Sequence, residues 1–214
     1  MKRFASLILG FVVLAGLCWV FPPFHVVPLE RAAKEKSAAV FNPTEFAEKF
    51  WSERLLKSLD QVTPADALLP AIRASAADAK KKFGHSVGVS ESYTYFIAGS
   101  GRVVAASDDE IAITVTPGAT NAEIVLLSGL LFGNAIRDGT GLLNVNDYPN
   151  SQDFNAISEA LNHLVETRVQ PQLREIAKIG ATIRFVGCAE VNDESSDLKP
   201  LRVAPVLAER ATQP

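Results

Sequence analysis

A chain of 214 residues with a formal net charge of −3 is long enough for one domain with a substantial core. Lys2 and Arg3 are the only charged residues among the first 21, so removing that segment takes the net charge from −3 to −5. An acidic exterior repels phosphate backbones and anionic lipid headgroups. Composition therefore disfavours nucleic acid as a partner, and it disfavours a polybasic contact with a membrane surface.

Residues 4–21 form an uncharged, apolar run directly behind Lys2 and Arg3. As a helix that rises about 1.5 Å per residue, this run nearly crosses a hydrocarbon core of roughly 30 Å. Positive charges in front of such a helix hold the N-terminus in the cytoplasm. The pattern predicts a signal anchor over residues 1–24, a single pass through a bacterial inner membrane, and a C-terminal domain in the periplasm.

Two other fates of the N-terminus stay open. A lipoprotein signal places a small residue directly before an acylated cysteine, but Leu17 separates Gly16 from Cys18 and weakens Cys18 as a lipidation site. Simple secretion needs a small-residue cleavage site, and residues 19–23 offer none. Cys188 is the only cysteine of the exported part, so we expect a buried thiol and no internal disulfide there.

Two helices are expected behind a charged connector over residues 25–40. Residues 42–45 (Asn-Pro-Thr-Glu) combine a capping side chain with a proline in the first turn, which is a helix start. Residues 63–66 (Thr-Pro-Ala-Asp) repeat that signal. The second helix is expected to run to the lysines at 80–82 and to end at Gly84.

The hydrophobic period changes from 3.6 to 2 at Tyr93, which indicates strands. Residues 93–105 form one long predicted strand that is bent at Gly99-Ser100-Gly101, because glycines permit sharp coiling. Residues 107–109 are the turn to the next strand. The other strands are expected at 110–116, 122–128, 141–145, 181–191 and 201–207.

A long helix should begin at Ser151 and be kinked or ended by Pro171. Two helices, a meander of strands, a helix and two closing strands make an α+β pattern. A glycine-bent first strand and a helix inserted before the last strands fit an OB-like, partly closed antiparallel β-barrel. We expect one such periplasmic domain, with helical elaborations, over residues 41–210.

One motif looks catalytic. Residues 84–88 (Gly-His-Ser-Val-Gly) match G-x-S-x-G, which in α/β-hydrolases lifts a nucleophilic serine on a turn from strand to helix. Here a predicted helix precedes the motif and a strand follows it, so a plain connector is favoured over a nucleophile at Ser86. The three histidines are scattered without metal-ligand spacing, and neither a metal nor a cofactor is predicted; they are His25, His85 and His163.

The densest group of polar residues lies between two apolar segments, from Gly133 to Asp153. So many hydrogen-bonding groups need partners, either within the fold or in a ligand. Arg137 is suited to clamp a carboxylate or a pair of sugar hydroxyls. The alternatives are a partner-protein surface or a structural role, with an internal Arg137–Asp138 salt bridge and a helix cap at Asn150. The candidate ligand- or partner-binding residues are Asn134, Arg137, Asp138, Asn144, Asp147 and Asn150.

The chain resembles a bacterial family of predicted periplasmic lipoproteins, domain of unknown function 2291. The resemblance implies an accessory protein encoded beside sugar-type ABC importers, without assigned catalytic residues. The segments that carry it are Gly99-Ser-Gly-Arg-Val-Val, Ser128-Gly-Leu-Leu-Phe-Gly-Asn-Ala-Ile-Arg-Asp-Gly-Thr-Gly, Asn146-Asp-Tyr-Pro-Asn-Ser-Gln-Asp-Phe-Asn and Gly180-Ala-Thr-Ile-Arg-Phe-Val-Gly-Cys-Ala.

The leading functional hypothesis is a membrane-anchored periplasmic accessory protein that is not an enzyme. Its expected partners are the permease of an ABC importer or the periplasmic binding protein of that importer. The first alternative is a periplasmic module that binds a small, sugar-like molecule through the segment that contains Arg137. The second is a serine hydrolase that uses Ser86.

Overall fold

The computed structural model describes residues 41–86, 91–148 and 150–211. Residues Asn42–Pro214 form one compact unit. The expected anchor over residues 1–24, the connector and Cys18 lie outside the described residues. In the part of the chain that is described, no helix is long and apolar enough to cross a membrane.

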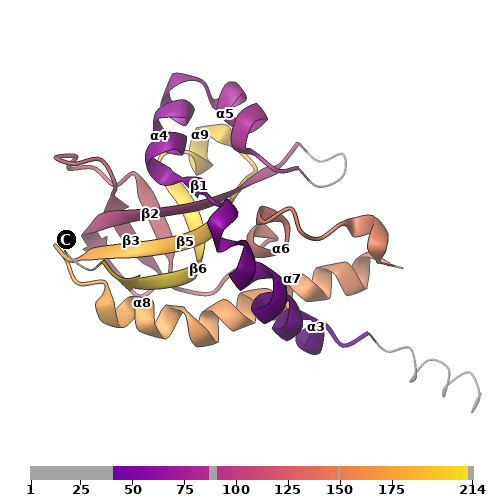
Figure 1. Cartoon of the computed structure of the whole chain (residues 1–214). Helices are drawn as coiled ribbons and strands as arrows, with labels where there is room; N and C mark the ends of the chain where they lie inside the picture. Colours follow the sequence, from indigo (N-terminus) through magenta and orange to yellow (C-terminus); the bar gives the residue numbers. More distant parts are fainter. Residues whose placement is uncertain (1–40, 87–90, 149, 212–214) are drawn as a thin grey trace, which may run out of the picture. The chain divides into compact units, whose positions relative to one another are not determined.

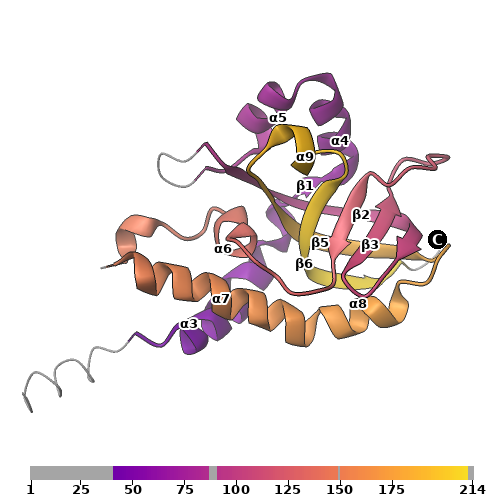
Figure 2. The same cartoon turned by 180° about the vertical axis from the view of Figure 1, so that it is seen from behind.

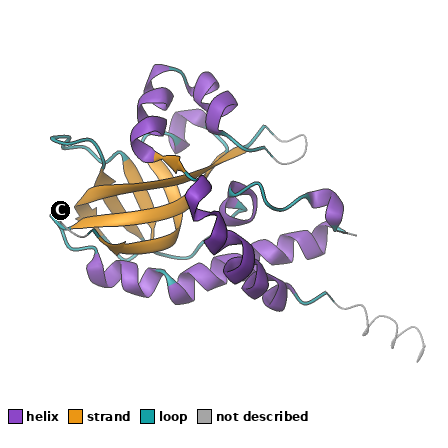
Figure 3. Cartoon of the chain, viewed as in Figure 1, coloured by secondary structure: helices purple, strands orange, loops and turns teal. Residues whose placement is uncertain are grey.

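The centre of the domain is a ring of strands (Figures 1 and 3). Around the ring the order is β2, β3, β4, β6 and β5, and β5 pairs again with β2. A five-stranded Greek-key ring of this kind is an OB fold, so the prediction of an OB-like barrel is confirmed. The strands are β2 (Tyr93–Ala106), β3 (Glu110–Thr114), β4 (Ile124–Leu127), β5 (Thr182–Val191) and β6 (Leu201–Arg210), and the two-residue strand β1 (Thr63–Pro64) pairs with the edge of β2.

Strand β2 is bent where the sequence predicts it. Residues 93–102 pair with β5, whereas residues 102–106 pair with β3. A Cβ atom on Gly101 would lie 2.9 Å from the carbonyl oxygen of Thr114, which is closer than a side chain tolerates. Glycine therefore lets β2 approach β3 while β2 changes its partner.

The expected strand at residues 141–145 is wrong. That segment is a loop, which leads into the short 3-10 helix η3 (Val145–Asp147). Gly141 has a φ of +66°, and Asn144 accepts a hydrogen bond from the N–H of Asn146, so the chain turns instead of extending. The barrel is closed by a parallel pairing of β4 with the first residues of β6. It is therefore not antiparallel throughout.

The second expected helix is two helices, α4 (Ala65–Ala74) and α5 (Ala76–Phe83). Ser75 is extended, and its hydroxyl accepts a hydrogen bond from the N–H of Asp78. The hydroxyl thus caps a new helix, a competition with the helical backbone that is typical of serine.

The remaining helices are arranged around the barrel (Figure 1). Helices α4, α5 and α9 cover one end, and α7 with α8 runs along the opposite side. Asn42 caps α3 and Asn150 caps α7, while Pro171 lies in the first turn of α8. These helices are α3 (Pro43–Phe50), α6 (Ala135–Gly139), α7 (Ser151–Arg168), α8 (Gln170–Ile176) and α9 (Glu194–Asp197), and the π-helical turn η1 (Trp51–Leu55) and the 3-10 helix η2 (Leu56–Gln61) continue α3.

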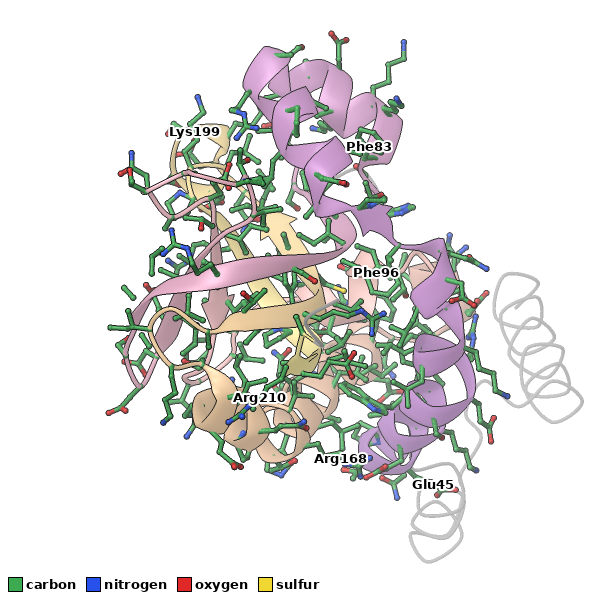
Figure 4. All side chains as sticks on the ribbon, turned by 60° about the vertical axis from the view of Figure 1, so that its left-hand side comes forward. Glu45, Phe83, Phe96, Arg168, Lys199 and Arg210 are labelled. Atoms are coloured by element: carbon green, nitrogen blue, oxygen red, sulfur yellow. The ribbon has the colours of Figure 1, made fainter. Side chains whose placement is uncertain are left out.

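Helix α3 is held against α7 by charge and by aromatic contacts. Arg168 of α7 forms an ion pair with Glu48 of α3, and Arg168 lies beside that helix in Figure 4. The ring of Phe46 meets Tyr148 edge-on with 5.9 Å between centroids, and Tyr148 lies 5.0 Å from Phe154. Helix α3 is therefore an integral layer of the domain and not a detached arm.

Glu123, at the start of β4, ties three elements together. Its carboxylate accepts hydrogen bonds from the N–H groups of Val115 and Thr116 and from the Thr116 hydroxyl, and it pairs with Arg73 of α4 at 2.9 Å. Partial burial acts to raise the pKa of this carboxyl. The hydrogen bonds outweigh burial and lower the pKa from 4.5 to about 2.

A lowered pKa makes the contribution of Glu123 to stability depend on pH. The contribution is complete above pH 4.5 and is lost as the pH falls towards 2, because the folded state then has to accept a proton it binds weakly. We expect Glu123→Gln to lower the free energy of unfolding at pH 7 by about 2 kcal/mol. Near pH 2 the variant and the unsubstituted protein should have the same free energy of unfolding. Urea unfolding at both pH values measures this.

Glu209→Gln is the matched control. Glu209 pairs with Arg184 at 2.5 Å, but both side chains are about half exposed. Exposed pairs contribute at most about 1 kcal/mol, so this variant should change stability little at either pH. An equal loss in both variants would contradict the role assigned to Glu123.

Candidate functional site

Arg137 is the centre of the polar segment, and the fold uses its charge internally. The side chain is only 5% exposed. Its Nε and Nη2 donate to the two carboxylate oxygens of Asp138, at 2.6 and 2.9 Å. Its Nη1 donates to the carbonyl of Phe154 and to Oδ1 of Asn155, and Cζ lies 3.8 Å from the centroid of the Phe154 ring. The internal salt bridge considered from the sequence is thus formed within α6, and the Nη1 hydrogen bonds of Arg137 join α6 to α7.

Asn134 precedes α6 and faces the same region. Its N–H donates to Oε2 of Glu190 on β5 at 2.8 Å, and its Oδ1 accepts from the hydroxyl of Ser158 on α7. Asn134, Arg137 and Asp138 line a cavity of about 140 Å³. The other residues that line it are His85, Ser92, Tyr93, Thr94 and Glu190.

Asn144 lines a second cavity, of about 550 Å³, which shares His85 with the first. Gly141 passes under the His85 ring, since a Cβ on this glycine would lie 3.4 Å from Nδ1. We call the two cavities together the His85 cleft. The second one is lined by Gly84, His85, Ser86, Gly141, Leu143, Asn144, Val145 and Asn146.

Asp147 and Asn150 do not line the His85 cleft. Asp147 is an exposed residue of η3. Asn150 caps α7, since its Oδ1 accepts from the N–H of Asp153 and its Nδ2 donates to the Asp153 carboxylate, both at 2.8 Å. The structure therefore brings four of the six candidate residues to one cleft.

The sequence did not point to three members of the cleft, which are His85, Thr94 and Glu190. Thr94 lies opposite Glu190 in the pairing of β2 with β5, and it exchanges two backbone hydrogen bonds of 2.8 Å with His85. The strands that supply Thr94 and Glu190 are far apart in sequence. No local sequence pattern predicts which residues of two such strands pair with each other.

The G-x-S-x-G motif lies where the sequence places it, after α5 and before β2. His85 and Ser86 are exposed. His163 lies on α7, and its Nδ1 is 3.9 Å from the Glu166 carboxylate. Within the described residues Ser86 has no hydrogen bond to His163, and no group of three histidine, cysteine or acidic side chains could hold a metal ion.

Cys188 is a free, fully buried cysteine beneath α6, as expected from the sequence. A Cβ on Gly139 would lie 2.5 Å from its Sγ, so α6 rests directly on β5. Burial, with a smaller contribution from nearby Asp138, raises the pKa of the thiol far above its usual value. The thiol is therefore neutral and serves as packing.

The buried position of Arg137 predicts a large effect on stability. Arg137→Ala leaves the Asp138 carboxylate without its partner, and breaking such a pair costs about 3 kcal/mol or more. We expect a loss of that size in urea unfolding at pH 7. Arg184→Ala, which breaks a pair that is half exposed, should cost less than about 1 kcal/mol. Equal costs would contradict the structural role of Arg137.

Comparisons with known proteins agree with this architecture. A crystal structure of an OB-fold protein from Thermotoga maritima MSB8 matches with a TM-score of 0.72 and 25% identity, over 80% of this chain and 99% of that one. No curated protein matches the chain. The family described as predicted periplasmic lipoprotein, domain of unknown function 2291, matches residues 8–209, and this supports a periplasmic, membrane-associated location. The chain belongs to that family of predicted periplasmic lipoproteins.

Proposed function

We propose that the protein is a non-enzymatic accessory protein, anchored at the periplasmic face of the inner membrane, that works with a sugar-type ABC importer. The observation that carries this proposal is the internal pairing of Arg137. The guanidinium of Arg137, in the most polar segment of the chain, is hydrogen-bonded to the Asp138 carboxylate and to the backbone of α7. Because these groups are already paired within the protein, the segment is suited to holding the protein surface in shape and poorly suited to acting on a substrate.

Three further features support the proposal. The family is described as predicted periplasmic lipoproteins, and a periplasmic location supports work with an importer, because importers receive their cargo in the periplasm. The segments from Gly99, Ser128, Asn146 and Gly180 carry the resemblance to this family, and that resemblance implies accessory proteins encoded beside sugar-type importers. The net charge of −5 behind the anchor favours protein partners over anionic lipid and nucleic acid.

Chemical crosslinking in intact cells tests the partnership. The full-length chain, tagged at its C-terminus, should recover peptides of an importer permease or of its substrate-binding protein. An unrelated tagged periplasmic protein of equal abundance serves as the control. Repeated recovery of no importer component would count against the proposal, and so would labelling of Ser86 by a fluorophosphonate probe that disappears in Ser86→Ala.

A second candidate function, the binding of a sugar-like molecule, is favoured by the His85 cleft. Its larger cavity, of about 550 Å³, is within the usual size range of ligand sites. Asn144 lines this larger cavity, and Asn134 and Glu190 line the smaller one, so both carry hydrogen-bonding groups. Sugar hydroxyls both donate and accept, so amides and carboxylates suit them.

Thermal unfolding with a panel of sugars and sugar phosphates tests this second candidate. A ligand at 100 times its dissociation constant adds about 2.7 kcal/mol to the free energy of unfolding and raises the midpoint. The shift should shrink in Asn144→Ala, which changes the cleft, but not in Asp147→Ala, which lies outside it. A flat response across the panel would remove this candidate.

A further inference from the structure

Residues Gly129–Gly133 connect the end of β4 to the start of α6 without regular secondary structure. We call this segment the strap. In Figure 2 it is part of the salmon loop that leaves the barrel and passes along α7 to α6. Within the described residues no strand pairs with the strap, so side chains of neighbouring helices supply several of the partners that its backbone groups need.

A row of polar side chains on α7 and α8 binds the strap. Nε2 of Gln170 donates to the carbonyl of Gly129 at 2.7 Å. The carboxylate of Glu166 accepts from the N–H of Leu131 at 2.8 Å, and Nδ2 of Asn162 donates to the carbonyl of Gly133 at 3.2 Å. Residues spaced by four lie on one face of a helix, so this row follows the strap along its length.

Each end of the strap also lies close to a carboxylate. A Cβ on Gly129 would lie 2.3 Å from Oδ1 of Asp109. The backbone carbonyl of Asp109 accepts a hydrogen bond from the N–H of Gly129. At the other end Oε2 of Glu190 lies 2.6 Å from the Cβ position of Gly133, which has a φ of +82°. The positive φ of Gly133 favours glycine there, whereas a side chain at Gly129 would have to displace the Asp109 side chain.

The fixed strap alternates between an inward and two outward side chains. Leu131 is buried, at 6% exposure. Leu130 and Phe132 are 77% and 83% exposed. Hydrogen bonds already fix the backbone that exposes this leucine and this phenylalanine to water. Binding of a partner therefore costs little backbone entropy, which favours tight association.

We infer that the strap is a docking surface for a protein whose apolar pocket, ringed by lysine or arginine, accepts Phe132 and Leu130. This inference rests on the proposed function as an accessory protein, and it names the surface that such a protein would use. The pocket is apolar because Phe132 and Leu130 are the anchors, and an aromatic anchor in a pocket is the usual centre of an interface.

The basic rim follows from charge complementarity. Asp109 and Glu190 flank the strap, and Glu166 lies beneath it. Within the described residues, the side chains that hydrogen-bond to the strap are acidic or neutral. Two copies of this surface would bring like charges together, and an anionic bilayer would meet the same repulsion. A basic partner surface is the complement.

Site-specific photocrosslinking of the full-length chain in its own cells tests the inference. A photoreactive phenylalanine analogue replaces Phe132 in one strain and Leu56 of η2 in another. Leu56 is the control because it is also an exposed large apolar residue, at 40%. It lies on the chain after α3. Helix α3 faces the viewer in Figure 1, whereas the strap faces the viewer in Figure 2. We expect a protein adduct from position 132 and not from position 56. The crosslinked peptide of the partner, identified by mass spectrometry, should adjoin lysine or arginine residues.

Two substitutions sharpen the test. The crosslinker is then placed at Leu130, with Phe132→Ser or Leu56→Ser in the same chain. Phe132→Ser should reduce the adduct about tenfold or more, and Leu56→Ser should not. The thermal midpoint of the purified Phe132→Ser protein should be unchanged, because that side chain is exposed. Raising the ionic strength should weaken capture further.

The outcomes separate the docking surface from the importer partnership. An adduct with an importer component supports both, and an adduct with another basic-rimmed protein keeps the surface but contradicts the importer. Importer peptides captured from Leu56 alone overturn the surface and leave the partnership standing. Adducts with lipid or with a second copy, or equal yields from both positions, overturn the inference.

Discussion

Strand β2 pairs with β5 along one edge and, beyond Gly101, with β3 along the other, and this change of partner lets the pairing of β4 with β6 close the barrel. The same pairing sets Thr94 opposite Glu190. From there the Glu190 carboxylate reaches the N–H of Asn134 and the end of the strap. The His85 cleft and the strap are thus built on the outer side of one strand pair, and both depend on its register.

Polar residues outside the sheet act mainly as ties between elements. Arg137 and Asp138 are almost fully buried, and Arg137, which Asp138 holds in place, links α6 to α7. Asn162 and Gln170 hold a segment that has no strand partner. A buried charge or amide is costly unless its hydrogen bonds are complete, so each of these groups fixes one arrangement of the backbone. The rigidity of the surface follows from their burial.

Two surfaces result from this construction, and they differ in chemistry. The His85 cleft is concave and polar, and it suits a hydroxylated small molecule. The strap exposes Leu130 and Phe132, and it suits a protein pocket. Both surfaces involve the segment from Ser128 to Gly141, which carries part of the likeness to the periplasmic lipoprotein family. A single segment thereby contributes to both surfaces and joins them to the barrel.

The amino-acid sequence by itself determined the α+β class, the bent first strand, the helix starts at Asn42 and Asn150, and the buried Cys188, because these depend on local periodicity, caps and glycines. It also indicated that Arg137 and Asp138 were available to pair. Only the tertiary structure decided that residues 141–145 turn, that the seam of the barrel is parallel, and that His85 and Glu190 share a region with Arg137. It alone showed Leu130 and Phe132 exposed, because the side of an irregular segment that faces water is set by distant hydrogen-bond partners and not by its own residues.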